Sequence, residues 1–299
     1  MKNYRLRNSM LLLLTALIWG TSFVATSKGV EAVQPITFTG FRLLLAGFSL
    51  LPLTLLRNRK IPDLGKFKKK DLILGGIGCG CSLIAAMILQ TIGIKYTTVG
   101  KAGFITAFYI ILVPVIGIFH GRKPSPLIWA AVGIALCGLY FICINERLSI
   151  AKGDAFCLAG AFCYALHILV IDRFSGITDG ISLSCVQFFV AGSIGLIFMF
   201  LFESPSLSAL GECIFSLLYA GVIANAVGDT LQIIGQKGLN PSVASLLMSM
   251  ESCFSLIAGF LILRQKPTFR ELSGCILMLA AIVLADFLPM ISERKETDN

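Results

Sequence analysis

Apolar residues occur along this chain in long runs, each separated from the next by a short stretch that carries proline, glycine or charge. Each run is about 20 residues long, which is the length that an α-helix needs to cross the hydrocarbon core of a bilayer. Helices are expected because lipid cannot satisfy the free backbone groups of an open sheet edge. The pattern therefore predicts an all-α integral membrane protein with ten transmembrane helices. The predicted spans are 9–28, 36–56, 72–93, 99–119, 126–144, 153–172, 182–202, 212–234, 241–263 and 270–288.

The second half of the chain repeats the first. Residues 89–95 read LQTIGIK and residues 231–237 read LQIIGQK, at an offset of 142. Nearer the amino terminus the offset is 145, so that Trp19 corresponds to Tyr164. A period this long makes the repeating unit half of the protein, and it dictates the architecture. The predicted units are a first five-helix repeat at 1–145, a second at 146–290, and a tail at 291–299.

Each predicted repeat contains an odd number of spans, so the second repeat enters the membrane upside down relative to the first. Inverted repeats are a recurring feature of secondary transporters, where they enclose a site near the middle of the bilayer and open it to each side in turn. Inverted repeats are also found in channels. The pattern favours the transporter.

Composition supports this class of protein. The chain is 56% hydrophobic and 14% charged, with a mean hydropathy of +0.86, whereas soluble domains contain about 25% charged residues. The cysteines lie mostly within apolar runs, and Cys79-Gly-Cys81 lacks the second cysteine pair of a zinc site. We therefore expect no disulfide framework, no metal and no cofactor. The first run resembles a signal peptide, but it has a repeat partner in the sixth run and is expected to be retained.

Lysine and arginine are distributed unequally between the two predicted sides. With the amino terminus inside, sixteen of them flank the inner ends of the spans and eight flank the outer ends. Cytoplasmic loops carry an excess of these residues. We therefore predict a multi-pass protein of the cell (cytoplasmic) membrane, with both termini in the cytoplasm. The net charge of +9 reflects this orientation, and nucleic acid is not an expected partner because no aromatic-basic surface accompanies the charge.

Two ionisable residues stand well inside predicted spans. Each such residue costs roughly 2.5–3.5 kcal/mol at the centre of a helix on insertion scales, so it requires a reason. Glu251 lies near the middle of the ninth span, and we interpret it as a group that couples protons or substrate; the alternative is a structural carboxyl bonded to a neighbouring helix. Arg42, in the second span, requires either a carboxylate partner such as Glu251 or Asp229, or an anionic substrate.

The eighth span carries a regular polar stripe, formed by Asn225, Asp229, Gln232 and Gln236. Their spacing places all four on one side of a helix. Lipid would leave these groups unpaired, so the stripe is expected to face protein. It either lines a solute pathway or joins helices by hydrogen bonds.

Two aromatic faces correspond through the repeat. Trp19 and Ser22 share a face of the first span, and the repeat places them opposite Tyr164 and His167 of the sixth span. We expect both faces to border one central cavity, whose aromatic walls and few polar groups suit a partly apolar metabolite. The repeat also pairs Tyr109 with Glu251 and Gln187 with Arg42. The candidate substrate-binding residues are Trp19, Ser22, Arg42, Tyr109, Tyr164, His167, Gln187, Asn225, Asp229 and Glu251.

Several segments resemble motifs of a known family. Residues 18–23 (IWGTSF), 41–47 (FRLLLAG) and 97–106 (TTVGKAGFIT), together with Gly153-Asp154 and residues 165–167 (ALH), are similar to motifs of the EamA branch of the drug/metabolite transporter superfamily. The resemblance covers nearly the whole chain. It implies a ten-helix, two-repeat transporter, with amino acids or related compounds as substrates and export as the direction. The family commonly has a proline after a glutamate in the ninth span; here Ser252 follows Glu251, so the hinge that a proline provides is not implied.

Other functions have weaker support. The signatures of zinc proteases, serine hydrolases and P-loop proteins are absent, so an enzyme is not expected and direct pumping by ATP is excluded for this chain alone. An exchanger of anionic sugar phosphates or nucleotide sugars would need several cations at mid-depth, where the sequence has Arg42. A membrane-embedded lipid-modifying enzyme would depend on His167 and Glu251. The expected partners are a small-molecule solute, the lipid bilayer and, through Glu251, coupled protons; the oligomeric state is left open.

Overall fold

The computed structural model describes residues 2–60, 67–97, 99–143, 152–205, 207–264 and 268–287, and these are helical apart from short connections. The first half forms α1 (Lys2–Ala32), α2 (Pro35–Lys60), α3 (Lys69–Tyr96), α4 (Val99–Thr106), α5 (Tyr109–Phe119) and α6 (Pro126–Cys143). The second half forms α7 (Lys152–Ser175), α8 (Gly180–Phe202), α9 (Leu207–Glu212), α10 (Ile214–Leu218), η2 (Tyr219–Asp229), α11 (Thr230–Gln236), α12 (Pro241–Met248), α13 (Glu251–Leu263), α14 (Phe269–Ile282) and η3 (Val283–Phe287). The tail predicted at 291–299 and the boundary predicted at 145 lie outside the described residues.

Eight helical segments of the described chain are long and apolar enough to cross a membrane. They agree with the first four predicted spans and with the sixth to ninth. The fifth predicted span corresponds to α6, whose apolar part, Pro126–Phe141, is shorter. The tenth corresponds to α14 and η3. The all-helical, two-repeat membrane fold is therefore confirmed, and the count of ten crossings stays a prediction.

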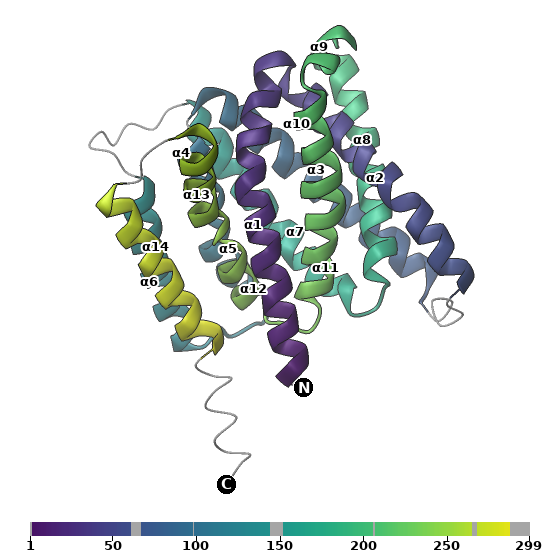
Figure 1. Cartoon of the computed structure of the whole chain (residues 1–299). Helices are drawn as coiled ribbons and strands as arrows, with labels where there is room; N and C mark the ends of the chain where they lie inside the picture. The colour runs from purple at the N-terminus through teal and green to yellow at the C-terminus, as the bar shows by residue number, and fades with distance from the viewer. Residues whose placement is uncertain are drawn as a thin grey trace.

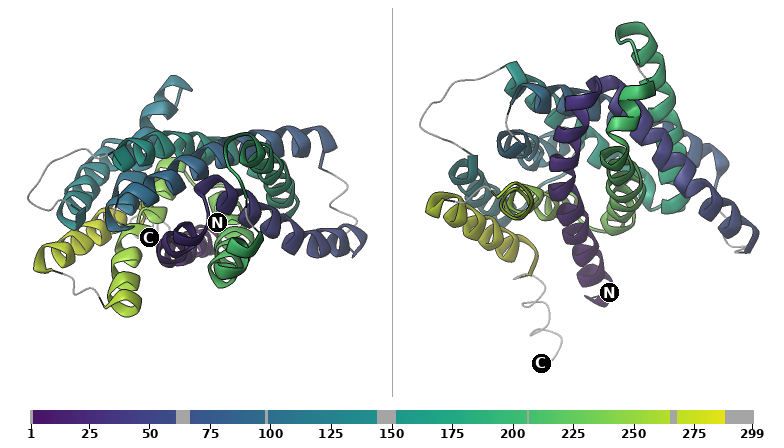
Figure 2. Two further views of the ribbon diagram at one scale, coloured as in Figure 1. Left: turned by 90° about the horizontal axis from the view of Figure 1, so that it is seen from above. Right: turned by 45° about the horizontal axis from the view of Figure 1, so that its top comes forward.

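The helices pack in pairs that the repeat relates to one another. At one edge of the bundle α2 packs on α8, and at the other edge α6 packs on α14; both pairs join equivalent helices (Figure 1). Between these edges α1 packs on α12 and α13, and its equivalent α7 packs on α4 and α5. Figure 2 shows the same pairs from two further directions. Each helix thus has a partner in the other repeat.

The two repeats run in opposite directions. On one face of the molecule, where α1 begins and α11 ends, Asn8 Nδ2 donates a hydrogen bond of 2.8 Å to the carbonyl oxygen of Lys237. On the other face, where α3 ends and α7 begins, Thr97 Oγ1 donates to Asp154 Oδ1 at 2.9 Å. The first helix of each repeat therefore starts from the opposite face, as the odd number of spans predicts.

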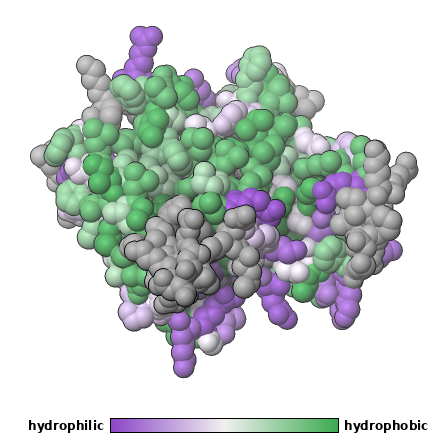
Figure 3. All heavy atoms as spheres, turned by 60° about the horizontal axis from the view of Figure 1, so that its bottom comes forward, coloured by the Kyte–Doolittle hydropathy of each residue, from purple (hydrophilic) through white to green (hydrophobic). Residues whose placement is uncertain are grey.

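Basic residues gather at the face where α1 begins. In Figure 3 hydrophilic side chains collect along the lower rim, below a broad hydrophobic surface. Helix ends at this face carry Arg5, Arg7, Arg57, Lys68, Lys69, Lys70, Arg122, Lys123, Arg173 and Lys237. Those at the other face carry Lys28, Lys95, Lys152, Arg264 and Arg270. The described residues therefore reproduce the predicted charge asymmetry.

The fourth and ninth spans are each broken in the middle, which the sequence pattern does not predict. One break lies between α4 and α5 and the other between α12 and α13, at positions that the repeat makes equivalent. In both breaks a backbone N–H bonds to the carbonyl oxygen three residues earlier, as in a 3₁₀ turn. These bonds run from Phe108 N to Ile105 O at 3.2 Å and from Met250 N to Leu247 O at 3.4 Å. Tight turns of this type inside a helix often mark a hinge. The ninth span is broken without the proline that the family commonly has.

The eighth span is not a uniform α-helix. Its central part, η2, is a π-helix of 11 residues that contains Asn225 and Asp229. π-Helical turns are rare and are frequently found at functional sites. Asn225 and Asp229, the half of the predicted polar stripe that faces the centre of the molecule, thus lie on a π-helix.

Candidate substrate cavity

A cavity lies between the two repeats. It is lined by residues of α1, α2, α3, α4 and α5 from the first repeat and of α7, η2 and α13 from the second. Eight of the predicted site residues contribute to its wall: Trp19, Ser22, Arg42, Tyr109, Tyr164, Asn225, Asp229 and Glu251. The volume open to the centre of a water molecule is about 40 Å³. One water needs about 10–15 Å³ of such volume, so this conformation holds a few waters and must widen to admit a metabolite.

Glu251 and Tyr109 meet in the cavity wall. Each is the first residue after one of the two helix breaks, and Tyr109 Oη donates a hydrogen bond of 2.9 Å to Glu251 Oε1. Glu251 is 3% exposed. Its second oxygen, Oε2, has no hydrogen-bond partner among the described residues. One carboxyl oxygen is therefore held in place while the other remains available to a ligand.

Gly20 explains how α1 comes so close to Glu251. A Cβ atom at this position would lie 2.6 Å from Phe254 Cβ and 2.8 Å from the carbonyl oxygen of Glu251. Both distances are shorter than real side chains tolerate, so only glycine allows α1 and α13 to cross here. Small residues permit such close helix packing in membranes. The glycine that follows Trp19 thus sets the position of the cavity wall.

Asp229 is held by two donors. Trp19 Nε1 donates to Asp229 Oδ1 at 2.9 Å, and Asn225 Nδ2 donates to Oδ2 at 2.9 Å. The indole comes from α1 and the aspartate from η2, so the contact joins the two repeats. Each oxygen of this buried carboxyl therefore has one neutral donor.

A related contact holds Tyr164. Its Oη donates to Gln90 Oε1 at 3.0 Å, and Gln90 Nε2 donates to Thr106 Oγ1 at 3.2 Å. Tyr164 is the repeat equivalent of Trp19, and each ring bonds to the third span of the other repeat. The cavity is thus bounded by two aromatic residues in corresponding contacts.

Arg42 does not form the ion pair that we considered. Its guanidinium donates to Thr26 Oγ1 at 3.2 Å and to Thr91 Oγ1 at 3.4 Å, and it lies 5.6 Å from the centre of the Phe38 ring. Within the described chain no carboxylate makes an ion pair with it. Its Nε is buried without a hydrogen-bond partner. In this conformation neither Glu251 nor Asp229 forms the ion pair with Arg42 that was one of the two alternatives.

His167 and Gln187 lie outside the cavity. They are fully buried and bond to each other, with His167 Nε2 3.1 Å from Gln187 Oε1. His167 turns to α8 because Gln187 offers it a polar partner there, whereas its repeat equivalent Ser22 remains in the cavity wall. Their part in substrate binding stays a prediction.

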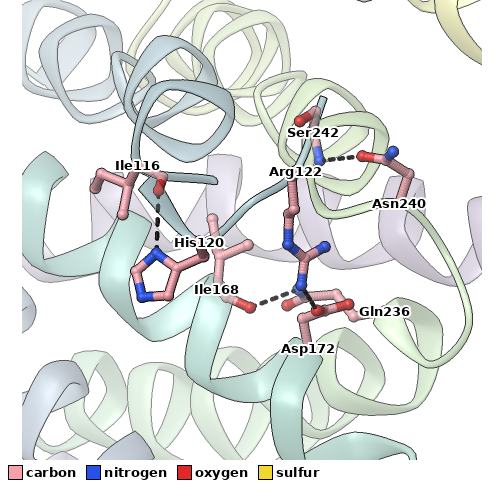
Figure 4. Close-up of polar contacts among 8 residues, drawn as sticks. All are labelled: Ile116, His120, Arg122, Ile168, Asp172, Gln236, Asn240 and Ser242. Atoms are coloured by element: carbon pink, nitrogen blue, oxygen red, sulfur yellow. Dashed lines mark hydrogen bonds and ion pairs between the residues drawn. The ribbon is translucent and has the colours of Figure 1, made fainter. Parts of the chain in front are cut away.

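The remaining half of the polar stripe lies outside the cavity wall, and one of its two residues joins helices. Gln232 and Gln236 are buried, and Gln236 Nε2 donates to the carbonyl oxygen of Ile168 on α7 at 3.2 Å; Figure 4 shows this contact. The stripe thus serves both expected purposes, with Asn225 and Asp229 in the cavity and Gln236 in helix packing.

Polar contacts close both ends of the molecule. On the face where α1 begins, Arg122 forms an ion pair with Asp172 at the end of α7 (Figure 4). On the opposite face, the carboxylate of Glu203 accepts hydrogen bonds from the backbone N–H groups of Ile36 and Thr37 at 2.9 and 2.6 Å. Each contact joins one repeat to the other.

The candidate substrate-binding residues do not make up the whole cavity wall. Seven further residues line it: Phe23, Thr26, Met87, Gln90, Ile94, Thr106 and Ala224. A signal existed for Gln90, because it is the repeat equivalent of Gln232 in the duplicated LQ-x-I-G-x-K segment. The apolar members carry no signal that separates them from ordinary core residues.

Comparison with known proteins gives one consistent result. The sequence profile of the EamA-like transporter family matches residues 7–144 and 151–285. An uncharacterized transporter of Archaeoglobus fulgidus is 26% identical over 286 residues, which cover 94% of this chain and 86% of that protein. The uncharacterized transporter YoaV of Bacillus subtilis is 25% identical over 281 residues, or 91% of this chain and 94% of that protein. The uncharacterized inner membrane transporter YedA of Escherichia coli is 25% identical over 252 residues, or 81% and 78%.

The fold is also found among solved structures. One crystal structure of a protein that is 18% identical superposes with a TM-score of 0.77, covering 94% of this chain and 96% of the other. The names of these relatives describe transporters, one of them an inner membrane transporter. Because the family profile matches both halves and nearly the whole length, this chain belongs to the EamA-like transporter family.

Proposed function

We propose that the protein is a secondary transporter that exports small metabolites, with amino acids as the expected class, by alternating access across the cytoplasmic membrane. The observation that carries the proposal is the cavity between two inverted repeats, whose wall carries both aromatic and polar side chains. Its wall takes side chains from both repeats, so a movement of one repeat against the other changes the cavity. Secondary transporters bind their solutes at such a place.

The two helix breaks supply the hinges. They lie at equivalent positions and at the level of the cavity, directly before Tyr109 and Glu251. Ser252 Oγ donates to the carbonyl oxygen of Gly103 at 3.2 Å, which ties one broken helix to the other. Bending at one break would open the cavity to one side, and bending at its equivalent would open it to the other. The contact of Arg122 with Asp172, or that of Glu203 with the start of α2, would separate in turn.

Glu251 is the group that we propose for proton coupling. Tyr109 fixes one of its oxygens, and the other has no partner among the described residues. A carboxyl that is held in place, and that each opening exposes to one side, exchanges a proton with that side only. With both termini in the cytoplasm, as the basic helix ends favour, proton entry would drive solute exit.

The alternative functions have less support from this geometry. Of the residues that line the cavity, Arg42 alone is cationic, whereas sugar phosphates or nucleotide sugars would need several cations. A lipid-modifying enzyme that uses His167 together with Glu251 would require the two to meet. His167 instead bonds to Gln187 outside the cavity.

Solute counterflow in liposomes tests the transport proposal. The purified full-length chain is reconstituted in vesicles preloaded with an unlabelled amino acid mixture, and uptake of the labelled amino acids is followed. We expect transient accumulation that protein-free vesicles lack. Absence of counterflow for amino acids and for other small metabolites in the same vesicles would count against a carrier. Release of a modified lipid headgroup would favour the enzyme.

A further inference from the structure

Arg42 is a buried charged residue within a membrane-spanning helix. It lies in α2, about a quarter of the way along this membrane-spanning helix, is 3% exposed, and contributes to the cavity wall. Charged groups inside membrane spans are rare, and they pair with one another or mark solute pathways. Arg42 therefore needs a counter-charge, from the protein or from a ligand.

Among the described residues no carboxylate contacts Arg42 directly, and Asp229 acts on it only across a longer distance. The partners of Arg42 are two threonine hydroxyls and the face of Phe38, all of them neutral. Its Nε is buried without a partner, although a guanidinium is built to bind a carboxylate through two parallel hydrogen bonds. A buried charge left without a counter-ion is costly. One donor of Arg42 is thus still to be satisfied.

The two carboxyls of the cavity are engaged elsewhere. Glu251 bonds to Tyr109, and Asp229 bonds to Trp19 and Asn225. Neither reaches Arg42 within ion-pair distance. The cavity therefore holds its cation and its acids apart, so that a solute which enters a widened cavity can lie between them.

The repeat places a neutral residue at the position equivalent to Arg42. The equivalent residue in the second repeat is Gln187, which is neutral and satisfied in part by His167. The fold accommodates an amide there, so the charge of Arg42 serves something that the second repeat does not do.

We propose that Arg42 binds the carboxylate of the transported solute, so that the substrates are small monocarboxylates. The inference rests on the proposed transport function and specifies its substrate class. A carboxylate supplies a counter-charge in direct contact and accepts from the free Nε–H. A phosphate dianion fits less well, because the cavity has one cation and two acids. The free Oε2 of Glu251 remains to accept from an amine, which amino acids carry.

Matched ligand pairs test this assignment on the purified full-length protein. The probes are L-leucine, L-phenylalanine and L-serine, each compared with its amide, which keeps the amine but removes the carboxylate. Binding is measured by the rise in thermal stability over a concentration series. The wild-type protein should bind at least one acid about tenfold more tightly than its amide, as expected for a charge-assisted hydrogen bond.

The variants Arg42→Gln and Arg42→Lys separate charge from structure. Arg42→Gln, which places the residue of the second repeat in the first, should bind acid and amide equally. Arg42→Lys keeps the charge and should retain part of the preference. Arg173→Gln, an exposed arginine outside the cavity, is the matched control and should behave as wild type.

The outcomes distinguish this assignment from the carrier proposal. The assignment of Arg42 is overturned if the wild type binds none of the three acids, if it binds every amide as tightly as the acid, or if Arg42→Gln keeps the preference. Should Arg42→Gln not fold, the wild-type comparison and Arg42→Lys still decide. Counterflow that persists in any of these cases leaves the carrier proposal standing, whereas loss of counterflow for all solutes removes it.

Discussion

Tyr109 donates a hydrogen bond to Glu251 at 2.9 Å, and the two residues are separated by 142 positions, the offset that relates the two repeats. A contact between equivalent residues lies close to the axis that relates the two repeats, at the centre of the fold. Both residues directly follow a helix break. The single carboxyl at this centre therefore responds to a bend in either repeat.

Glu251→Gln should uncouple solute movement from protons. The amide oxygen still accepts from Tyr109, so the wall keeps its shape, but the side chain no longer takes up and releases a proton. We expect solute counterflow to persist and accumulation driven by a pH gradient to be lost, as measured in liposomes. Unchanged gradient-driven accumulation would contradict the proposed coupling.

Tyr109→Phe is the matched variant for that experiment. It removes the hydrogen bond to Glu251 and leaves the carboxyl in place. A single neutral hydrogen bond contributes about 0.5–1.5 kcal/mol, so the transport rate should fall by roughly two- to tenfold while gradient-driven accumulation remains. Loss of coupling in both variants would point to the geometry of the wall rather than to proton exchange.

Gly20→Ala should destabilise the protein. The added methyl group would enter the backbone of α13 near Glu251 and Phe254, and such overpacking typically costs about 1–3 kcal/mol. Thermal unfolding in detergent should show a lower midpoint. Gly133→Ala is the control, because a Cβ there meets no atom within 4 Å; its midpoint should be equal or slightly higher. Equal midpoints for Gly20→Ala and wild type would show that α1 shifts freely.

Arg122→Gln should loosen the face at which α1 begins. The ion pair with Asp172 is partly exposed, and pairs of this type contribute about 0.2–1 kcal/mol. A cysteine introduced at Gln236 in a cysteine-depleted background should then react with a thiol reagent roughly two- to fivefold faster. Lys123→Gln removes the neighbouring charge and should leave the rate unchanged. Equal rates for all three proteins would exclude this ion pair from the closure.

The face that carries Arg122 is predicted to be cytoplasmic. In intact cells, a membrane-impermeant thiol reagent should label a cysteine placed at Lys28, at the end of α1, but not one placed at Lys123. Permeabilised cells should show labelling at both positions. The opposite pattern would reverse the orientation and, with it, the proposed direction of proton-driven transport.

The duplicated segments made much of this site predictable. Because the repeat equates Trp19 with Tyr164 and Tyr109 with Glu251, residues far apart in the sequence are expected in one place before any contact is known. The structure brings these four into one wall. The inverted arrangement follows from the five apolar runs that the sequence predicts for each repeat.

Other features depend on tertiary contacts that the sequence does not display. Neither break has a proline within it, and the residues 107–108 and 249–250 tolerate a regular helix, so local propensity gives no warning. His167 lies outside the cavity wall because it forms a hydrogen bond with Gln187 on another helix. The polar stripe was predicted from the spacing of an α-helix, and the π-helical stretch of the eighth span departs from that spacing. Each of these outcomes is decided by a neighbouring helix.

Arg42 lies seven residues into α2, about 10 Å from the beginning of that helix at a rise of 1.5 Å per residue. Its hydroxyl partners, Thr26 and Thr91, stand near the ends of α1 and α3 at the same face. A solute anchored there rests off the midplane. Entry and exit then cross unequal fractions of the membrane voltage, so one leg of the cycle should be more sensitive to membrane potential than the other.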